Sequence, residues 1–182
     1  DYIINTVLTP DGQLVGVFAG EMEAAHRAAA RLARQLFAVT IQERADLVIA
    51  SSGPNRNFVQ SHKALYNAYQ AVKPEGRIIL LAECKEGLGG ESFEKWLRFD
   101  SRETLVAELK RHSEINGQTA LSTLEKAPIT VMVSELGEEE VARLGARKAP
   151  TLQEALEMVR AELPANPTYY LMPNAAYTVP FL

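Results

Sequence analysis

The first third of the chain shows two β-rich runs followed by a helical pattern. Residues 2–8 and 13–20 are rich in β-branched and aromatic residues, and the Thr-Pro-Asp-Gly between them predicts a turn joining antiparallel strands. Residues 21–37 are rich in Ala, Arg and Leu, with acidic residues in the first turn and basic residues later, which favours a helix. We therefore expect a β-hairpin followed by a helix.

Two continuous apolar runs follow, at residues 46–50 and 77–83. Because their hydrophobic residues do not alternate with polar ones, both faces of these strands should be covered by helices, as in a parallel sheet. A helix is expected between them from about residue 58 to 72, and the Lys-Pro-Glu-Gly at 73–76 should end it.

The second half repeats this alternation of helices and strands. Helices are expected at 92–99, 101–114, 117–127, 137–145 and 151–163, and strands at 128–134 and 168–174. The order predicts the α/β class, with an open, mostly parallel, Rossmann-like three-layer sheet and an N-terminal β-hairpin. We expect one domain over residues 1–182, and expect the proline-rich tail at 163–180 to run over the surface.

Composition narrows the class of partner and the compartment. The net charge of −4, with both signs mixed and no basic stripe, argues against nucleic acid, so an anionic ligand would need local cations. The single cysteine excludes an internal disulfide framework and fits a reducing cytoplasm. Neither a membrane-spanning run nor the residue order of a signal peptide is present, so we expect a cytoplasmic protein without membrane contact. Because the chain begins at Asp1 almost inside a strand, we expect it to be part of a longer chain.

Ligands of open α/β sheets bind at the carboxyl ends of the strands, which here lead into the loops 51–58 and 83–91. Gln60 and Lys63 are three residues apart, so both project from one face of the helix beside those loops. A lysine can neutralise a carboxylate or phosphate, and a glutamine can donate to and accept from a hydroxyl. Spacing alone favours the alternative that both are ordinary solvated residues.

Other candidates carry weaker signals. Glu83 lies at the end of a strand. Its carboxylate could face a ligand, or it could interact with the N-terminus of a nearby helix. Cys84 is either a nucleophile or a small buried thiol, and the lack of a paired histidine favours the thiol. The loop at Gly87–Gly90 could hold an anion on its backbone N–H groups, but it matches neither a dinucleotide motif nor a P-loop. No metal site is expected, because the histidines lack ligand spacing and should be exposed: His26, His62 and His112.

Several segments together resemble one known family. They are "GVFAGEMEAAHR", "ADLVIASSG", "VQSHKAL", "AVKPEGRIILLAECKEGLG" and "LMPNAAYTVP". In order and spacing they resemble the C-terminal domain of the nickel-dependent lactate racemase family, over nearly the whole chain. The most specific parts are the Gln-x-x-Lys at 60–63 and the strand end with its glycine loop at 82–89.

The resemblance implies a function. Family members are two-domain enzymes that interconvert stereoisomers of 2-hydroxy acids by hydride transfer, using a nickel-pincer nucleotide. Their cofactor lysine, metal-binding histidine and catalytic histidines lie in the N-terminal domain, so this domain alone should be inactive and should bind no cofactor or metal. The implied partners are that N-terminal domain and a small 2-hydroxy acid, with a homo-oligomer possible.

The resemblance also reverses the interpretation of Gln60 and Lys63, which spacing alone favoured as ordinary solvated residues. Gln60 and Lys63 match a pair that contacts the substrate or the cofactor, and Ser52, Gly53 and Glu83 are the other contacts we expect. Val59 departs from the family pattern, in which an aromatic residue often precedes the glutamine, so the substrate could differ from lactate.

Two alternatives belong to other classes of protein. A free-standing α/β module that binds or regulates through an anionic metabolite or nucleotide would have a start codon at the hairpin. A purely structural dimerisation domain would show no effect of any ligand. The gene sequence upstream of Asp1 discriminates between the racemase and the free-standing module.

Overall fold

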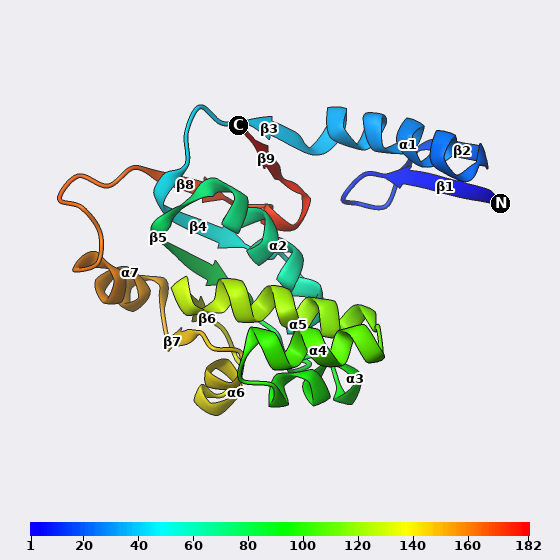
Figure 1. Ribbon diagram of the computed structural model, residues 1–182. Coiled ribbons are helices and arrows are strands. Elements are labelled where there is room, and N and C mark those ends of the chain that lie inside the picture. Colours follow the sequence, from blue (N-terminus) through cyan, green and yellow to red (C-terminus); the bar gives the residue numbers. More distant parts are fainter.

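The centre of the molecule is a five-stranded parallel sheet, seen in the computed structural model of residues 1–182 (Figure 1). Its strand order is β7-β6-β5-β4-β8, and every neighbouring pair is parallel. The strands are β4 (Ala45–Ser51), β5 (Val72–Leu81), β6 (Thr130–Val133), β7 (Arg147–Ala149) and β8 (Tyr169–Met172). The expected open, parallel α/β sheet is confirmed.

Helices cover both faces of this sheet. On one face α2 (Phe58–Ala71) packs on β4 and β5, with α5 (Ile115–Lys126) behind it, and on the other face α7 (Leu152–Arg160) packs on β5, β6 and β7. Alternate residues of β5 serve the two layers, since Ile78 and Leu80 join the α2 core whereas Ile79 joins the α7 core. This double burial explains why the strand sequences are continuously apolar.

Short helices close the end of the molecule beside α5. They are α3 (Glu91–Glu94), the 3₁₀ helix η1 (Lys95–Arg98), α4 (Arg102–Arg111), η2 (Ala127–Ile129) and α6 (Glu138–Arg143). Phe93, Trp96 and Leu105 are buried and extend the main core into this region.

The N-terminal residues form an arm that stands apart from the body (Figure 1). The hairpin consists of β1 (Tyr2–Leu8) and β2 (Leu14–Glu21), and α1 (Met22–Phe37) packs on one of its faces. The Glu21 carboxylate caps α1 by accepting from the backbone N–H groups of Glu23 and Ala24 at 3.0 and 2.9 Å. Both expected elements are confirmed.

The Lys-Pro-Glu-Gly segment follows the end of α2, as expected, but it belongs to strand β5. The helix ends at Ala71, and the chain enters β5 directly, with a register shift between the pairs Ala45–Val72 and Leu47–Arg77. A Cβ atom on Gly76 would lie 2.7 Å from the Asp46 carbonyl oxygen and 2.6 Å from the Val72 side chain. The glycine therefore permits a close approach of two strands.

Part of the C-terminal tail packs into the body, whereas we expected it to run over the surface. Beyond β8, the 3₁₀ helix η3 (Ala175–Tyr177) is tied to α2, since the Asn67 side-chain amide donates to the Ala175 carbonyl at 2.7 Å. The last strand, β9 (Val179–Phe181), pairs in parallel with β3 (Ala38–Thr40). Strands of three residues, β7 included, carry too few positions to show a period in the sequence.

None of the helices combines the length and the apolar character that a membrane crossing requires.

Asp46 joins the starts of three strands and should give the fold an acid-sensitive contribution to stability. Its carboxylate accepts from Lys73 Nζ at 2.8 Å and from the N–H and hydroxyl of Thr168 at 2.8 and 2.7 Å. These hydrogen bonds, that from Lys73 foremost, lower the pKa of Asp46 to about 2. The ionised form is thus favoured by folding above the ordinary pKa of about 4, and this contribution is lost as the pH falls from about 4 to about 2.

We predict that Asp46→Asn flattens the fall in the free energy of unfolding over that pH range, as measured by urea denaturation. Asp100→Asn is the matched control, because Asp100 is exposed and makes no side-chain hydrogen bond. Parallel curves for the parent and Asp46→Asn would contradict the assignment.

Candidate functional site

The loops that follow β4 and β5 lie side by side at the carboxyl edge of the sheet, as expected from the parallel strand order. The Ser52 N–H donates to the Leu81 carbonyl at 2.9 Å, and the Glu86 N–H donates to the Arg56 carbonyl at 2.7 Å. An ion pair of 2.7 Å joins the side chains of Arg56 and Glu86. The two loops therefore form one continuous surface.

The carbonyl groups of the glycine loop hold the start of α2, and anion binding by the loop's own N–H groups stays a prediction. Backbone N–H groups of Phe58 and Val59, in the first turn of α2, donate to the carbonyls of Gly87 and Leu88 at 3.1 and 3.2 Å. The Asn57 side chain caps the same turn by accepting from the Gln60 N–H at 3.1 Å. These N–H groups, which would otherwise attract an anion, are thus already paired.

Gln60 and Lys63 lie together on the exposed face of α2. Lys63 Nζ donates to Gln60 Oε1 at 3.1 Å, and Lys63 makes no ion pair with any carboxylate of the chain. The contact leaves two ammonium N–H groups of Lys63 and the amide NH₂ of Gln60 open to a ligand. These donors, next to the loop surface, suit a carboxylate or another small oxyanion.

The other residues predicted to contact a ligand are not joined to the Gln60–Lys63 pair. Ser52 is buried, and its hydroxyl donates to the Gly53 carbonyl at 3.3 Å, while Gly53 adopts the positive φ of +66° that the turn needs. Glu83 is exposed and paired with Lys85, whose pKa it raises through their hydrogen bond. No hydrogen bond or ion pair joins Ser52 or Glu83 to the pair on α2, so their contacts with a ligand stay a prediction.

Cys84 is buried, as the sequence favoured. Its Sγ lies 3.6 Å from the Ser61 hydroxyl, and burial raises the pKa of the thiol. Because the thiolate is the reactive form, this cysteine is poorly suited to act as a nucleophile. It is also the single non-glycine residue with positive φ, 55°, at the point where β5 leads into the glycine loop.

His62 is buried, and our expectation that it is exposed was wrong. Its ring packs against Phe58 and Tyr66, at centroid distances of 6.1 and 6.5 Å, because α2 is covered by α5 as well as by the sheet. Burial, together with the nearby Lys126 ammonium, lowers the pKa of His62 to about 4. The ring is therefore neutral at pH 7, and its Nε2 has no hydrogen-bond partner.

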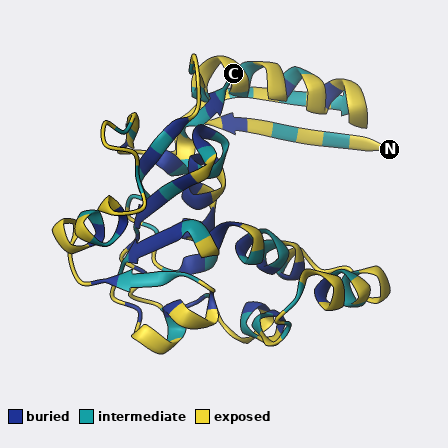
Figure 2. Cartoon of the chain, turned by 60° about the vertical axis from the view of Figure 1, so that its left-hand side comes forward, coloured by how far each residue is buried: buried dark blue, intermediate teal, exposed yellow.

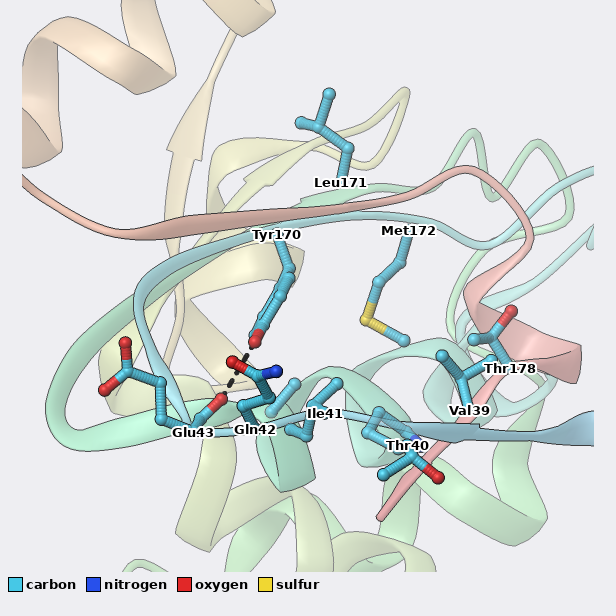
Figure 3. A pocket seen from close by; sticks show the side chains of 11 residues that line it. Val39, Thr40, Ile41, Gln42, Glu43, Tyr170, Leu171, Met172 and Thr178 are labelled. Atoms are coloured by element: carbon cyan, nitrogen blue, oxygen red, sulfur yellow. Dashed lines mark hydrogen bonds between the residues drawn. The ribbon is translucent and has the colours of Figure 1, made fainter. Parts of the chain in front are cut away.

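A cavity of about 380 Å³ lies elsewhere, between β3, β8 and β9 (Figure 3). Its lining includes Ile41, Met172 and Thr178, and the Tyr170 hydroxyl closes one side by donating to the Glu43 carbonyl at 3.0 Å. None of the residues predicted for the site lines it. The carboxyl edge is thus an open surface, and nothing in the sequence indicated the cavity.

The structure is thus that of a Rossmann-like α/β domain with an amide and an amine exposed side by side next to the carboxyl edge of its sheet. Residues 40–178 match the family model described as the lactate racemase C-terminal domain. The chain belongs to this family, as the resemblance of its motifs indicated.

Two curated relatives are lactate racemases. The protein from Thermoanaerobacterium thermosaccharolyticum is 35% identical over 100 residues, which are 53% of this chain and 23% of that protein. The protein from Lactiplantibacillus plantarum is 36% identical over 95 residues, which are 50% of this chain and 22% of that protein. The matches therefore span less than a quarter of each relative.

Solved structures support the same assignment. The lactate racemase apoprotein from T. thermosaccharolyticum superposes with a TM-score of 0.83 at 25% identity, covering 100% of this chain and 46% of that one. A Thermotoga maritima protein superposes with a TM-score of 0.65 at 13% identity, covering 100% of this chain and 49% of that one, and shows the fold alone.

Gly89 should be essential for holding the glycine loop against α2. A Cβ atom there would lie 2.6 Å from Val59 Cγ2, whereas a Cβ on Gly90, which also has positive φ, would meet nothing within 4 Å. We predict that Gly89→Ala lowers the free energy of unfolding by about 1–3 kcal/mol more than Gly90→Ala, because only the first change overpacks the contact. Urea denaturation measures both. Adding Val59→Ala should restore part of the difference, and equal losses for the two glycine variants would refute the close contact.

Proposed function

We propose that this chain is the C-terminal domain of a two-domain, nickel-dependent racemase or epimerase that acts on 2-hydroxy acids. The carboxyl edge of its sheet faces the active site, which is held by the N-terminal domain. The observation that carries the proposal is the Gln60–Lys63 pair, exposed and free of any carboxylate, in a domain of the lactate racemase family. The partial coverage of the relatives supports a second domain.

The pair on α2 binds and orients the substrate in this proposal. A 2-hydroxy acid carries a carboxylate beside a hydroxyl, and the Lys63 ammonium and the Gln60 amide supply one group suited to each. Because Lys63 Nζ already rests on Gln60 Oε1 at 3.1 Å, the two side chains are partly organised before the ligand arrives. Closure of the other domain over this edge would exclude water and strengthen both contacts.

The side chains of this chain do not fit a nickel site. No group of three or more His, Cys, Asp or Glu side chains is placed to hold a metal ion. The Cys84 thiol is buried with a raised pKa, and the His62 ring is buried between α2 and α5. We therefore assign the nickel-pincer nucleotide to the N-terminal domain and give the residues of this chain the task of positioning.

We predict that Lys63→Ala in the full-length enzyme lowers kcat/KM for racemisation roughly ten- to a hundredfold, since a charged hydrogen bond contributes about 1.5–3 kcal/mol. The loss should be smaller for Lys63→Arg, which keeps the charge. Melting temperature should not change, because the side chain is exposed and has no partner outside its own helix.

Lys110→Ala is the matched control, since Lys110 is another exposed helical lysine without an ion pair. Each variant is first shown to carry its nickel cofactor, and rates are then measured on several 2-hydroxy acids. If Lys63→Ala matches the parent on every substrate, Lys63 is an ordinary surface lysine and the role assigned to it is wrong.

A further inference from the structure

The arm at residues 1–37 packs mainly on itself. The packing contacts of α1 are chiefly with β1 and β2, and only its C-terminal end reaches the body, where Arg34 lies over the Phe181 ring and Phe37 lies 6.4 Å from the Tyr177 ring. The inner side of the arm is close-packed, because Val7, Ala25 and Ala29 are buried and a Cβ on Gly16 would lie 2.8 Å from the Leu32 side chain. In Figure 2 the rest of the arm is almost entirely yellow and teal, unlike the dark blue central sheet.

The opposite face of the hairpin is apolar and uncovered. Cross-strand pairs on this face join Ile4 to Ala19 and Thr6 to Val17. Ile4 is 69% exposed and Val17 is 54% exposed, and the face continues through Tyr2, Leu8 and Leu14. Both outer edges of this two-stranded sheet are also unpaired. An exposed apolar face of this kind is typical of an interaction surface, so we expect a covering partner.

The segment that matches the family model includes the body but not the arm. The model of the C-terminal domain begins at residue 40, after the arm has ended. Yet the superposition on the solved lactate racemase covers the whole chain, arm included, and more than half of that protein lies outside the match. The arm thus has a counterpart in a longer protein without belonging to the part that defines the C-terminal domain.

The segment that connects the arm to the body is thinly held. Its strand β3 pairs with β9 over three residues, residues 39–43 line the cavity of about 380 Å³, and Ile41 alone among them packs against the main core. Gln42, Glu43 and Arg44 are exposed. An exposed segment with few contacts is typical of a linker between two domains.

We propose that residues 1–37 belong structurally to the domain that precedes them in the full-length protein, and that this domain covers the outer face of the hairpin. The boundary between the domains then lies at residues 38–44, and not before residue 1 as we expected from the sequence. The occupant is the same polypeptide, because the solved lactate racemase that superposes on the whole chain, arm included, has more than half of its length outside the match. The inference rests on the proposed function only for the existence of a preceding domain.

Hydrogen–deuterium exchange of the unmodified full-length protein gives the first test. Amides of β1 and β2, outer edges included, should exchange as slowly as those of the central strand β5. Exchange of the hairpin as fast as that of an exposed loop would overturn the proposal. The result does not depend on racemase activity, so it separates this inference from the proposed function.

Two charged substitutions on the outer face, Ile4→Lys and Val17→Lys, give the second test. Each should lower the melting temperature of the full-length protein by about 5 °C or more, because a charge is then buried between domains. Ile115→Lys is the control, since Ile115 is 83% exposed at the start of α5 and should tolerate the change. Melting temperatures that match the control would show that nothing covers the face. A variant that only converts a dimer to a monomer, with unchanged unfolding, would show that a second copy covers it.

Discussion

The candidate site depends on the hydrogen bonds between the glycine loop and the first turn of α2. Carbonyl groups of Gly87 and Leu88 occupy the N–H groups of Phe58 and Val59, which fixes the helix against the end of β5. Gly89 makes this approach possible, because a side chain there would collide with Val59. The helix then holds Gln60 in its first turn and Lys63 one turn later, side by side and facing solvent. The backbone of the glycine loop thus fixes the helix that carries the pair.

Because the N–H groups of Phe58 and Val59 are paired, they are not available to bind an anion at the edge of the sheet. With the helix terminus satisfied, positive charge is presented by a side chain, Lys63, and not by backbone dipoles. A lysine can follow a ligand that moves as two domains close, whereas a fixed backbone cradle cannot. The exposure of Gln60 and Lys63 suits a surface that completes a site held elsewhere.

Much of the fold could be predicted because its signals are local. The apolar runs of β4 and β5 and the helix patterns between them indicated a parallel sheet, and the Gln-x-x-Lys spacing indicated a shared face on α2. The failures depend on contacts distant in sequence. His62 is buried because α5 packs on α2, and β9 forms because β3 lies beside it, which no local pattern reports. The segment at 73–76 ends the helix as predicted, but its place in β5 was not foreseen, because the close contact of Gly76 with Asp46 joins two strands.

The central claim is that Lys63 meets the anionic end of a 2-hydroxy acid, and chemical modification of the full-length enzyme tests it most directly. The rate of acetylation of Lys63 by a small amine-reactive reagent is measured by mass spectrometry with and without a saturating 2-hydroxy acid that the enzyme racemises. Lys110 serves as the internal reference in the same protein. The account predicts that the ligand slows modification of Lys63 several-fold and leaves Lys110 unchanged. Equal protection of both lysines, or of neither, would contradict it.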